Sequence, residues 1–227
     1  MKKITIIIPA HNEEDRIERA ASRILGEPYL CRKVEFLFIV DGNDRTYDIL
    51  IKMGEKYPKA KMRIKKYPKR LGKGGAVAEG IRNSHTPYVG FLDVDISIPI
   101  EQINRMVELL LKNKLDCIVG IRREVKGIPA TRKLSSLSFN LLVNSLFGLG
   151  LKDTQCGCKF FKKKFVTEHE ELFRVKGFAF DVELLDLIRR KGGEITGHEI
   201  ISSWEGGKFS LFESPKMLLD IVWLKLS

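Results

Sequence analysis

Short apolar runs rich in β-branched residues alternate with segments of helical periodicity, and this alternation constrains the fold more than any other feature of the chain. The apolar runs cover residues 4–8, 34–40, 62–64, 88–92 and 117–119. The segments of helical period cover residues 13–25, 46–57, 74–83 and 101–113. Strands that are apolar on both faces and separated by helices predict an α/β fold, a mainly parallel sheet flanked by helices.

The alternation ends after residue 123. A basic loop is predicted up to residue 133, followed by helices at 134–149, 180–190 and 214–226 and a strand at 194–201. The chain has 227 residues, with neither an internal repeat nor a low-complexity linker. This length suits one large domain, so we expect residues 1–227 to form a single domain.

Ligands of open α/β sheets bind at the carboxyl ends of the strands, so the residues that follow each predicted strand are candidates for a site. These residues are polar, glycine-rich or charged at positions 9–13, 41–44, 69–75, 93–95 and 120–123. The sequence therefore predicts one polar site along this edge of the sheet.

Two carboxylates, Asp93 and Asp95, directly follow the apolar run 88–92. One residue separates them, so their side chains leave the same face of an extended chain. Carboxylates this close repel each other unless a cation lies between them. Because Mg²⁺ and similar ions bind one or two carboxylates together with phosphate oxygens, the pair predicts a metal that binds a diphosphate. Surface or capping carboxylates are the alternative interpretation.

The segment Arg70-Leu-Gly-Lys-Gly-Gly75 leads into a predicted helix. Glycines at this place let backbone amides approach an anion, and the helix N-terminus adds partial positive charge. A P-loop is excluded because no Ser or Thr follows Lys73, and a GxGxxG fingerprint is excluded because Val77 stands at the third glycine. The segment predicts either a phosphate contact or a flexible basic turn.

Forty Lys and Arg against 29 Asp and Glu give a net charge of +11, which suggests an anionic partner. Solvated lysines in the runs 59–73 and 159–164 explain this charge equally well. Aromatic residues are not interleaved with the basic ones, so we expect no nucleic-acid partner. The four cysteines lack CxxC spacing, which predicts reduced and mostly buried thiols.

The chain runs from Met1 directly into a predicted strand, and no stretch approaches the roughly 20 apolar residues of a membrane span. These features predict a cytoplasmic protein.

Four motifs, in this order along the chain, carry a resemblance to a known family: Ile-Ile-Ile-Pro-Ala-His-Asn-Glu, Ile-Val-Asp-Gly-Asn-Asp, Gly-Lys-Gly-Gly-Ala and Asp-Val-Asp. They resemble the family 2 glycosyltransferases of the A-type, Rossmann-like fold. Segments 153–161, 180–185 and 204–210 are similar to the dolichyl-phosphate sugar synthases, more to the glucosyl branch than to the mannosyl branch. The resemblance implies a metal-dependent, inverting transfer of a hexose from a nucleotide sugar to a polyprenyl or dolichyl phosphate, by an enzyme peripheral to the cytoplasmic face of a membrane.

Carried over position by position, the resemblance implies a role for each matching residue. Nucleotide-sugar binding falls to Pro9, Ala10, Asn12, Glu13, Asp41, Lys73, Asp93, Val94 and Asp95. Asp93 and Asp95 hold the metal, Mg²⁺ or Mn²⁺. The catalytic set is Asp93, Asp95, Arg122, Arg132 and Lys208, and the acceptor contacts are Arg122, Arg132, Gln155 and Lys208. Residues 1–123 are thus expected to bind the nucleotide sugar, and residues 124–227 to bind the acceptor.

The sequence departs from the family pattern at three places. Gly42 follows Asp41 where further carboxylates are usual, which bears on the choice of nucleobase. Cys158 replaces an aromatic residue, and Ser97 stands where some mannosyl relatives have a Gln.

The basic and acidic residues have different roles for a lipid-phosphate acceptor and for a hydroxyl acceptor. A lipid phosphate is already ionised near neutral pH, so it needs cations rather than a general base. A hydroxyl acceptor needs a base, for which Asp153, Asp181 and Glu183 are the candidates. The apolar segments 134–149 and 217–226 predict core packing for most of their residues, and otherwise a ledge for a polyprenyl tail or a peripheral membrane contact.

UDP-glucose is the expected donor and GDP-mannose the alternative. Two other functions remain open at this point: a non-catalytic module that binds anionic membranes or nucleic acid, and a nucleotidyltransferase.

Overall fold

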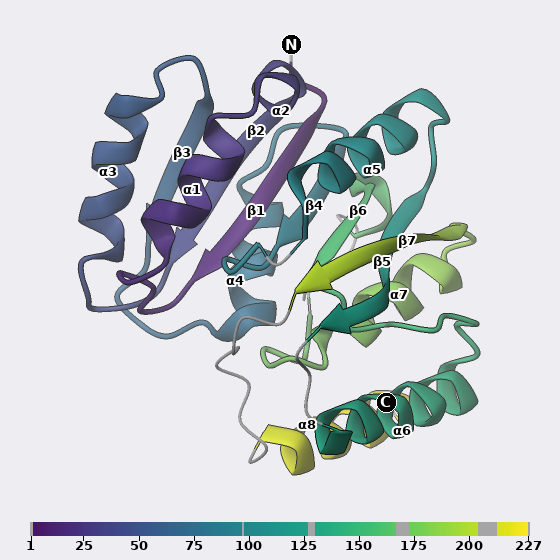
Figure 1. Ribbon diagram of the computed structural model, residues 1–227. Helices are drawn as coiled ribbons and strands as arrows, with labels where there is room; N and C mark the ends of the chain where they lie inside the picture. Colours follow the sequence, from purple (N-terminus) through teal and green to yellow (C-terminus); the bar gives the residue numbers. More distant parts are fainter. Residues whose placement is uncertain (1, 97, 127–129, 167–172, 204–212, 227) are drawn as a thin grey trace.

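The computed structural model describes residues 2–96, 98–126, 130–166, 173–203 and 213–226. Within these ranges the side chains of residues 124–126, 130–136, 202–203 and 213–216 are not described. The fold is a single α/β domain built on a seven-stranded sheet of order β3-β2-β1-β4-β6-β5-β7 (Figure 1). The strands are β1 (Ile4–Ala10), β2 (Val34–Val40), β3 (Lys61–Lys66), β4 (Tyr88–Leu92), β5 (Cys117–Lys126), β6 (Cys158–Lys162) and β7 (Ile195–Ser203).

Every neighbouring pair of strands is parallel except those that involve β6, which runs antiparallel to both β4 and β5. The prediction of a mainly parallel sheet is therefore confirmed. Strand β6 comes from the second half of the chain but lies between two strands of the first half, so the two halves share one sheet.

Helices cover both faces of the sheet (Figure 1). Buried side chains from α1, α2, α3 and α5 form the core on one face, and those from α4, α6, α7 and α8 form the core on the other. The helices are α1 (Ile17–Leu25), α2 (Pro28–Lys33), α3 (Thr46–Lys56), α4 (Gly72–Arg82), α5 (Ile100–Lys112), α6 (Ala130–Phe147), α7 (Phe180–Arg190) and α8 (Glu213–Leu226), with a short 3-10 helix η1 (Lys163–Phe165).

Strand β1 explains why the apolar runs do not alternate with polar residues. Ile4, Ile6 and Ile8 pack into one core and Ile7 into the other, and all four are fully buried. A strand buried on both faces needs apolar residues at consecutive positions.

Strand β5 differs from the prediction, which ended it before residues 120–123. It continues to Lys126 because it pairs in parallel with β7, across an irregularity between Arg122 and Glu124. Arg122 therefore lies within the strand rather than in a loop after it. Helix α2 and strand β6 had no prediction, since each spans only five or six residues.

Glu35 of β2 is a buried carboxylate that ties the edge strand β3 to the sheet. It pairs with Lys61 at 2.9 Å and with Arg63. Burial alone would raise the pKa of Glu35, but the hydrogen bonds and charges of Lys61 and Arg63 lower it. A lowered folded-state pKa stabilises the fold above the unfolded pKa of about 4.3, and this contribution is lost as the pH falls through the folded-state value.

We therefore expect Glu35→Gln to lower the free energy of unfolding at pH 7 by about 1 to 3 kcal/mol. The loss should shrink as the pH is lowered from 7 towards 3, because the wild-type carboxylate then becomes protonated too. Urea unfolding at several pH values measures both effects, and a pH-independent loss would contradict the assignment.

Candidate active site

The turn after β4 presents Asp93 and Asp95 at the carboxyl edge of the sheet. The Asp93 N–H donates to the Gly157 carbonyl at 2.9 Å, and the Asp93 carbonyl accepts from Ile96 N–H at 3.0 Å. Ile96 takes a positive φ of 40°, which tightens the turn. The Asp93 side chain is 38% exposed, Asp95 is half-buried and Val94 is buried. The turn that follows β4 thus holds Asp93 against the segment that leads into β6.

Lys73, in the first turn of α4, lies against this turn. Its Nζ is 2.7 Å from Asp93 Oδ1 and 3.9 Å from Asp181 Oδ2, and the side chain is only 13% exposed. The ammonium lies 5.6 Å from the ring centroid of Phe91 and 5.7 Å from those of Phe178 and Phe180. Burial would lower the pKa of Lys73, but the charges of Asp93 and Asp181 outweigh it and raise the pKa. Lys73 is therefore a charged ammonium in a largely enclosed position.

The glycines around Lys73 serve close packing. Gly72 has a φ of +72°, and a Cβ at Gly74 would collide with the Val175 carbonyl and with Phe180. The Gly74 N–H donates to the Lys176 carbonyl at 2.9 Å. Because this amide already has an acceptor within the protein, the glycines serve to pack α4 against residues 175–180. The positive charge that this segment brings to the site comes from Lys73.

The ends of β1 and β2 carry the residues expected around a nucleobase. Asp41 is buried, and its Oδ1 lies 3.1 Å from His11 Nδ1 while its Oδ2 accepts from Leu71 N–H at 2.7 Å. Asn12 has a φ of 52°, and its side-chain oxygen accepts from Asn43 N–H at 3.0 Å.

A Cβ at Gly42 would collide with the Asn12 side chain, which explains why a glycine follows Asp41 here. Pro9 and Ala10 end β1 beside this group. Glu13 pairs with Arg16 at 2.7 Å, and its N–H donates to Thr46 Oγ1 at 2.8 Å. His11 lies inside the first motif but had no predicted role.

Arg122 and Asp153 form a two-pronged ion pair between β5 and the segment before β6. Arg122 Nε lies 2.6 Å from Asp153 Oδ2, and Nη2 lies 3.0 Å from Oδ1. Burial would raise the pKa of Asp153, but the hydrogen bonds and the charge of Arg122 lower it. Gln155 joins the group because its N–H donates to Asp153 Oδ1 at 3.1 Å, while its side-chain amide lies 3.1 Å from Met217 Sδ of α8.

Sequence reasoning missed Lys159, which it placed in a run of surface lysines. The side chain is fully buried in β6, and its Nζ contacts Asp181 Oδ1 at 2.5 Å and the Cys156 carbonyl at 2.7 Å. Neighbouring lysines masked the signal, since only the strand periodicity of residues 158–162 distinguishes Lys159 from them.

Two predicted site residues have no described side chain. The backbone of Arg132 lies in α6, and Lys208 falls outside the described residues. The predicted thiol state fits the structure, in which Cys31, Cys117, Cys156 and Cys158 are free and three of them are buried.

Comparisons with known proteins agree with the fold and the motifs. The family model Glycosyl transferase family 2 matches residues 5–180. The dolichyl-phosphate beta-glucosyltransferase of Dictyostelium discoideum is 30% identical over 242 residues, which cover 98% of this chain and 73% of that protein.

Two solved structures share the fold at lower identity. Glucosyl-3-phosphoglycerate synthase from Mycobacterium tuberculosis, in complex with Mn²⁺, UDP and phosphoglyceric acid, has a TM-score of 0.73 and 19% identity, covering 99% of this chain and 78% of that one. A mannosyltransferase from Pyrobaculum calidifontis, in complex with GDP-Man and Mn²⁺, has a TM-score of 0.72 and 16% identity, covering 98% of this chain and 62% of that one. The chain belongs to glycosyl transferase family 2 and is a glycosyltransferase with the A-type fold.

Proposed function

We propose that this glycosyltransferase moves glucose from UDP-glucose to a polyprenyl phosphate such as dolichyl phosphate, with inversion at the anomeric carbon and with the help of a divalent cation. The name of the Dictyostelium relative, which is similar along nearly the whole chain, specifies a glucosyl group, a dolichyl-phosphate acceptor and a beta linkage. Membership in an enzyme family sets aside the non-catalytic binding module.

The three carboxylates that could act as the general base for a hydroxyl acceptor all accept hydrogen bonds from the protein, and this favours a phosphate acceptor. Asp153 is held by Arg122, and Asp181 is held by Lys159. Glu183 accepts hydrogen bonds from the N–H groups of Arg174 and Val175, at 2.9 and 3.0 Å. A general base must be poised to take a proton from the acceptor, and each of these carboxylates is already engaged by donors of the protein. A phosphate acceptor needs no base, which fits this arrangement.

Asp93 and Asp95 fit a divalent cation. An ammonium already lies 2.7 Å from Asp93 Oδ1, so the carboxylate faces a position that accepts positive charge. Among the residues that the structure describes, no group of three or more His, Cys, Asp or Glu gathers to hold a metal. The protein would thus supply two carboxylates and leave room for diphosphate oxygens and water, as Mg²⁺ prefers.

The reaction places negative charge on the departing diphosphate. When bound, the cation supplies positive charge at that point. Lys73, which lies between Asp93 and Asp181, would keep a second positive charge near the diphosphate. Arg122, held in place by two bonds to Asp153, is our candidate cation for the acceptor phosphate. An acceptor oxygen attacks the anomeric carbon as the bond to the diphosphate breaks, so an α-linked donor yields a β-linked lipid phosphosugar and UDP.

Incubation with a panel of nucleotide sugars tests this proposal. We expect UDP-glucose, Mn²⁺ and a short polyprenyl phosphate together to release UDP and form a lipid-linked glucose, and omission of the lipid or addition of EDTA to stop the reaction. GDP-mannose is the second donor in the panel. Nucleotide release that is indifferent to the lipid would contradict the acceptor, and release of pyrophosphate would indicate nucleotidyl transfer.

Gly157 offers a test of the metal site, because a Cβ at this position would collide with the Asp93 carboxylate. We expect Gly157→Ala to weaken Mn²⁺-dependent UDP binding by about tenfold to a hundredfold, since changes to residues that orient a metal ligand cost that much in metal affinity. Gly54→Ala in α3 is the control, because its methyl would meet only Met62 Sδ, at 3.9 Å. Wild-type UDP affinity in Gly157→Ala would argue against Asp93 as a ligand.

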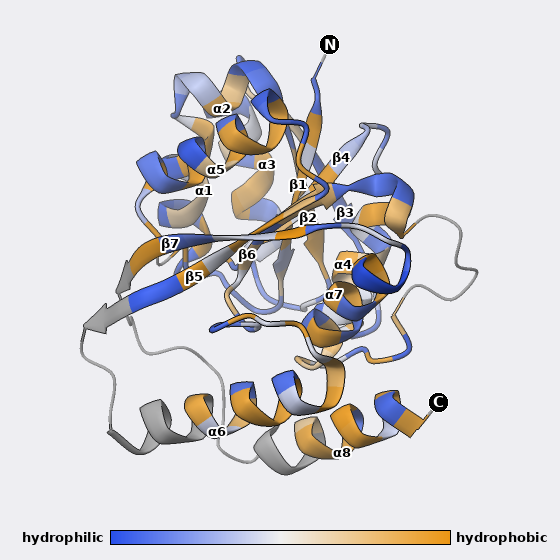
Figure 2. Cartoon of the chain, turned by 90° about the vertical axis from the view of Figure 1, so that its right-hand side faces the viewer, coloured by the Kyte–Doolittle hydropathy of each residue, from blue (hydrophilic) through white to orange (hydrophobic). Residues whose placement is uncertain are grey.

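Helices α6 and α8 lie side by side at one end of the molecule, below α7 and the sheet (Figure 2). Large apolar side chains on both helices are exposed: Leu137, Leu141, Leu218, Leu219, Val222, Trp223 and Leu226. No helix in the described part of the chain is long and apolar enough to cross a membrane. We propose that this surface, the α6/α8 face, rests on the bilayer that holds the lipid acceptor.

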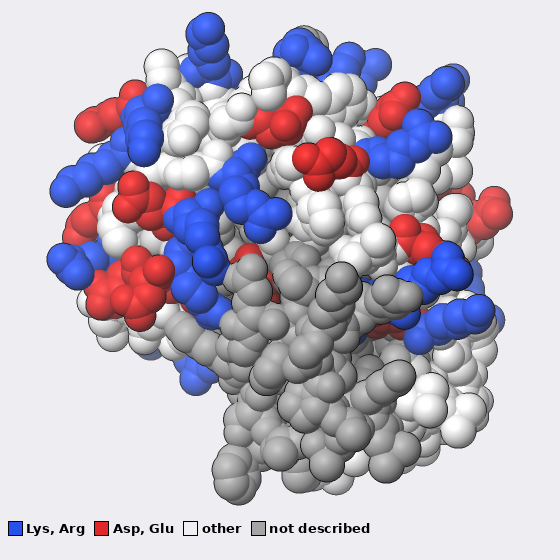
Figure 3. Space-filling model, in the orientation of Figure 1, with Lys and Arg blue, Asp and Glu red and all other residues white. Residues whose placement is uncertain are grey.

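On the face shown in Figure 3, acidic side chains lie close to basic ones in the described upper part, so basic charge is interspersed with acidic charge there. We expect apolar contact through the α6/α8 face to contribute most of the membrane binding.

Vesicle binding tests the α6/α8 face. We expect the variant Leu141→Glu/Leu219→Glu to bind phosphatidylcholine–phosphatidylglycerol vesicles at least about tenfold more weakly, because both side chains would lose apolar contact. Ile51→Glu, an exposed apolar residue on α3, is the control and should bind like the wild type. Equal binding by all three proteins would contradict the proposed face.

A further inference from the structure

Lys159, which had no predicted role, forms a buried ion pair with Asp181. Lys159 is 0% exposed and Asp181 is 2% exposed, and their charged atoms are 2.5 Å apart. Burying two charges is costly, and replacing such a pair by neutral residues is often tolerated. Stability alone therefore does not explain why this pair is charged.

The pair continues toward the surface as a chain of alternating charges. One oxygen of Asp181 contacts Lys159, and the other lies 3.9 Å from Lys73 Nζ. Lys73 Nζ in turn lies 2.7 Å from Asp93 Oδ1. The order from the core outward is thus Lys159, Asp181, Lys73 and Asp93.

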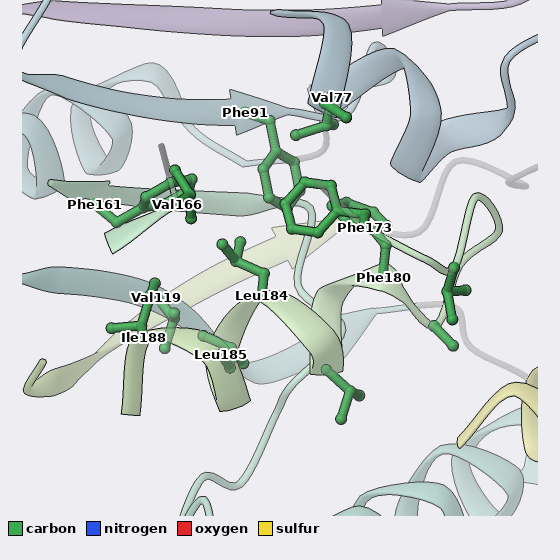
Figure 4. Packing of buried hydrophobic residues seen from close by; sticks show 14 of the residues in the cluster. Val77, Phe91, Val119, Phe161, Val166, Phe173, Phe180, Leu184, Leu185 and Ile188 are labelled. Carbon is green, nitrogen blue, oxygen red and sulfur yellow. The ribbon is translucent and has the colours of Figure 1, made fainter. Parts of the chain in front are cut away.

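The surroundings of Lys73 limit where its ammonium can move. Phe91 of β4 and Phe180 of α7 point toward one another across this region, with centroids 5.2 Å apart (Figure 4). Together with Phe178 they place aromatic rings within 6 Å of the ammonium. Asp181 is already within ion-pair distance, so it offers a second carboxylate at the cost of a short movement.

In the structure, Lys73 contacts Oδ1 of Asp93, one of the two carboxylate oxygens that this residue offers to a divalent cation. A cation and an ammonium on the same carboxylate would repel each other. Loading of the cation therefore favours a movement of Lys73 from Asp93 to another anion.

We propose that Asp181, fixed by Lys159, is a positioning residue for Lys73: it receives the ammonium when a divalent cation takes Asp93. This inference rests on the proposed function, since it assumes a cation at Asp93 and Asp95. Lys159 neutralises Asp181 from the buried side and keeps one of its oxygens directed at Lys73.

Titration of the protein with Mn²⁺, without donor or acceptor, tests the idea. The electron paramagnetic resonance signal of free Mn²⁺ measures how much of the ion is bound. Lys73→Met should tighten Mn²⁺ binding about tenfold, a coupling of the size found within charge networks. The paired variant Lys159→Met/Asp181→Asn should weaken Mn²⁺ binding about tenfold, because Lys73 then loses the buried carboxylate that would receive it. The paired variant removes one charge of each sign, so the net charge is unchanged.

The decisive comparison combines the two changes. In the Lys73→Met background, removal of the buried pair should alter Mn²⁺ affinity by less than about twofold, because no ammonium is left to position. The control Lys162→Met/Asp116→Asn removes another ion pair of β6, with a separation of 2.7 Å, and should leave Mn²⁺ affinity unchanged. Thermal unfolding reports whether each variant is folded.

Two outcomes would overturn the inference. One is an equal loss of Mn²⁺ affinity with and without Lys73, which would mean that Asp181 acts on the cation directly. The other is unchanged Mn²⁺ affinity in Lys73→Met, a variant that tests the idea even where the paired variant does not fold. Failure of the wild type to bind Mn²⁺ in the presence of UDP would instead contradict the proposed function itself.

Discussion

Asp93→Ala is expected to lower turnover by about a thousandfold or more, because it removes a ligand of the cation that stabilises the departing diphosphate. The same change should bring UDP affinity in the presence of Mn²⁺ down to the value measured without Mn²⁺. The fold should persist, since the Asp93 side chain is 38% exposed and Lys73 still faces Asp181. Steady-state kinetics and UDP titrations with and without Mn²⁺ measure both effects.

Asp48→Ala is the matched control for Asp93→Ala, since Asp48 is an exposed carboxylate on α3. It should keep wild-type turnover and wild-type response to Mn²⁺. If Asp93→Ala retained metal-stimulated turnover, the assignment of Asp93 would be wrong.

Arg122→Ala is expected to reduce both activity and stability. Its partner Asp153 has a side chain that is only 8% exposed, so the variant leaves a buried carboxylate without its cation. Breaking a fully buried pair costs 3 to 5 kcal/mol, and we expect about 2 to 3 kcal/mol here because Arg122 is 30% exposed. Turnover should fall by about a hundredfold or more, through the loss of a cation for the acceptor phosphate.

The double variant Arg122→Ala/Asp153→Ala separates the two effects. It removes the unpaired carboxylate, so most of the stability should return, while turnover stays low. Arg122→Lys keeps the charge but loses the two-pronged geometry, and we expect intermediate turnover. Recovery of turnover in the double variant would show that Arg122 serves the fold alone.

Much of the fold follows from local sequence. The runs 34–40 and 88–92 coincide with β2 and β4, and helix 180–190 coincides with α7. These elements were predictable because buried parallel strands are uniformly apolar and because amphipathic helices carry a clear period. The position of Asp93 and Asp95 after β4, at the edge of the sheet, was predictable for the same reason, while their role as metal ligands stays a prediction.

The remaining features depend on contacts between distant segments. The antiparallel strand β6 has only five residues, and its place between β4 and β5 is decided by tertiary pairing. The buried pair of Lys159 and Asp181 joins positions that are 22 residues apart in the sequence. The pair of Arg122 and Asp153 joins positions that are 31 residues apart. No local pattern specifies such ion pairs, so sequence reasoning treated Lys159 as a surface residue and Asp153 as a possible base.

The binding of Mn²⁺ and UDP in a crystal tests the central claim most directly. The account predicts anomalous density for Mn²⁺ between the carboxylates of Asp93 and Asp95 and the pyrophosphoryl oxygens of UDP, with Lys73 displaced from Asp93. UDP bound without metal density at Asp93 and Asp95 would contradict it.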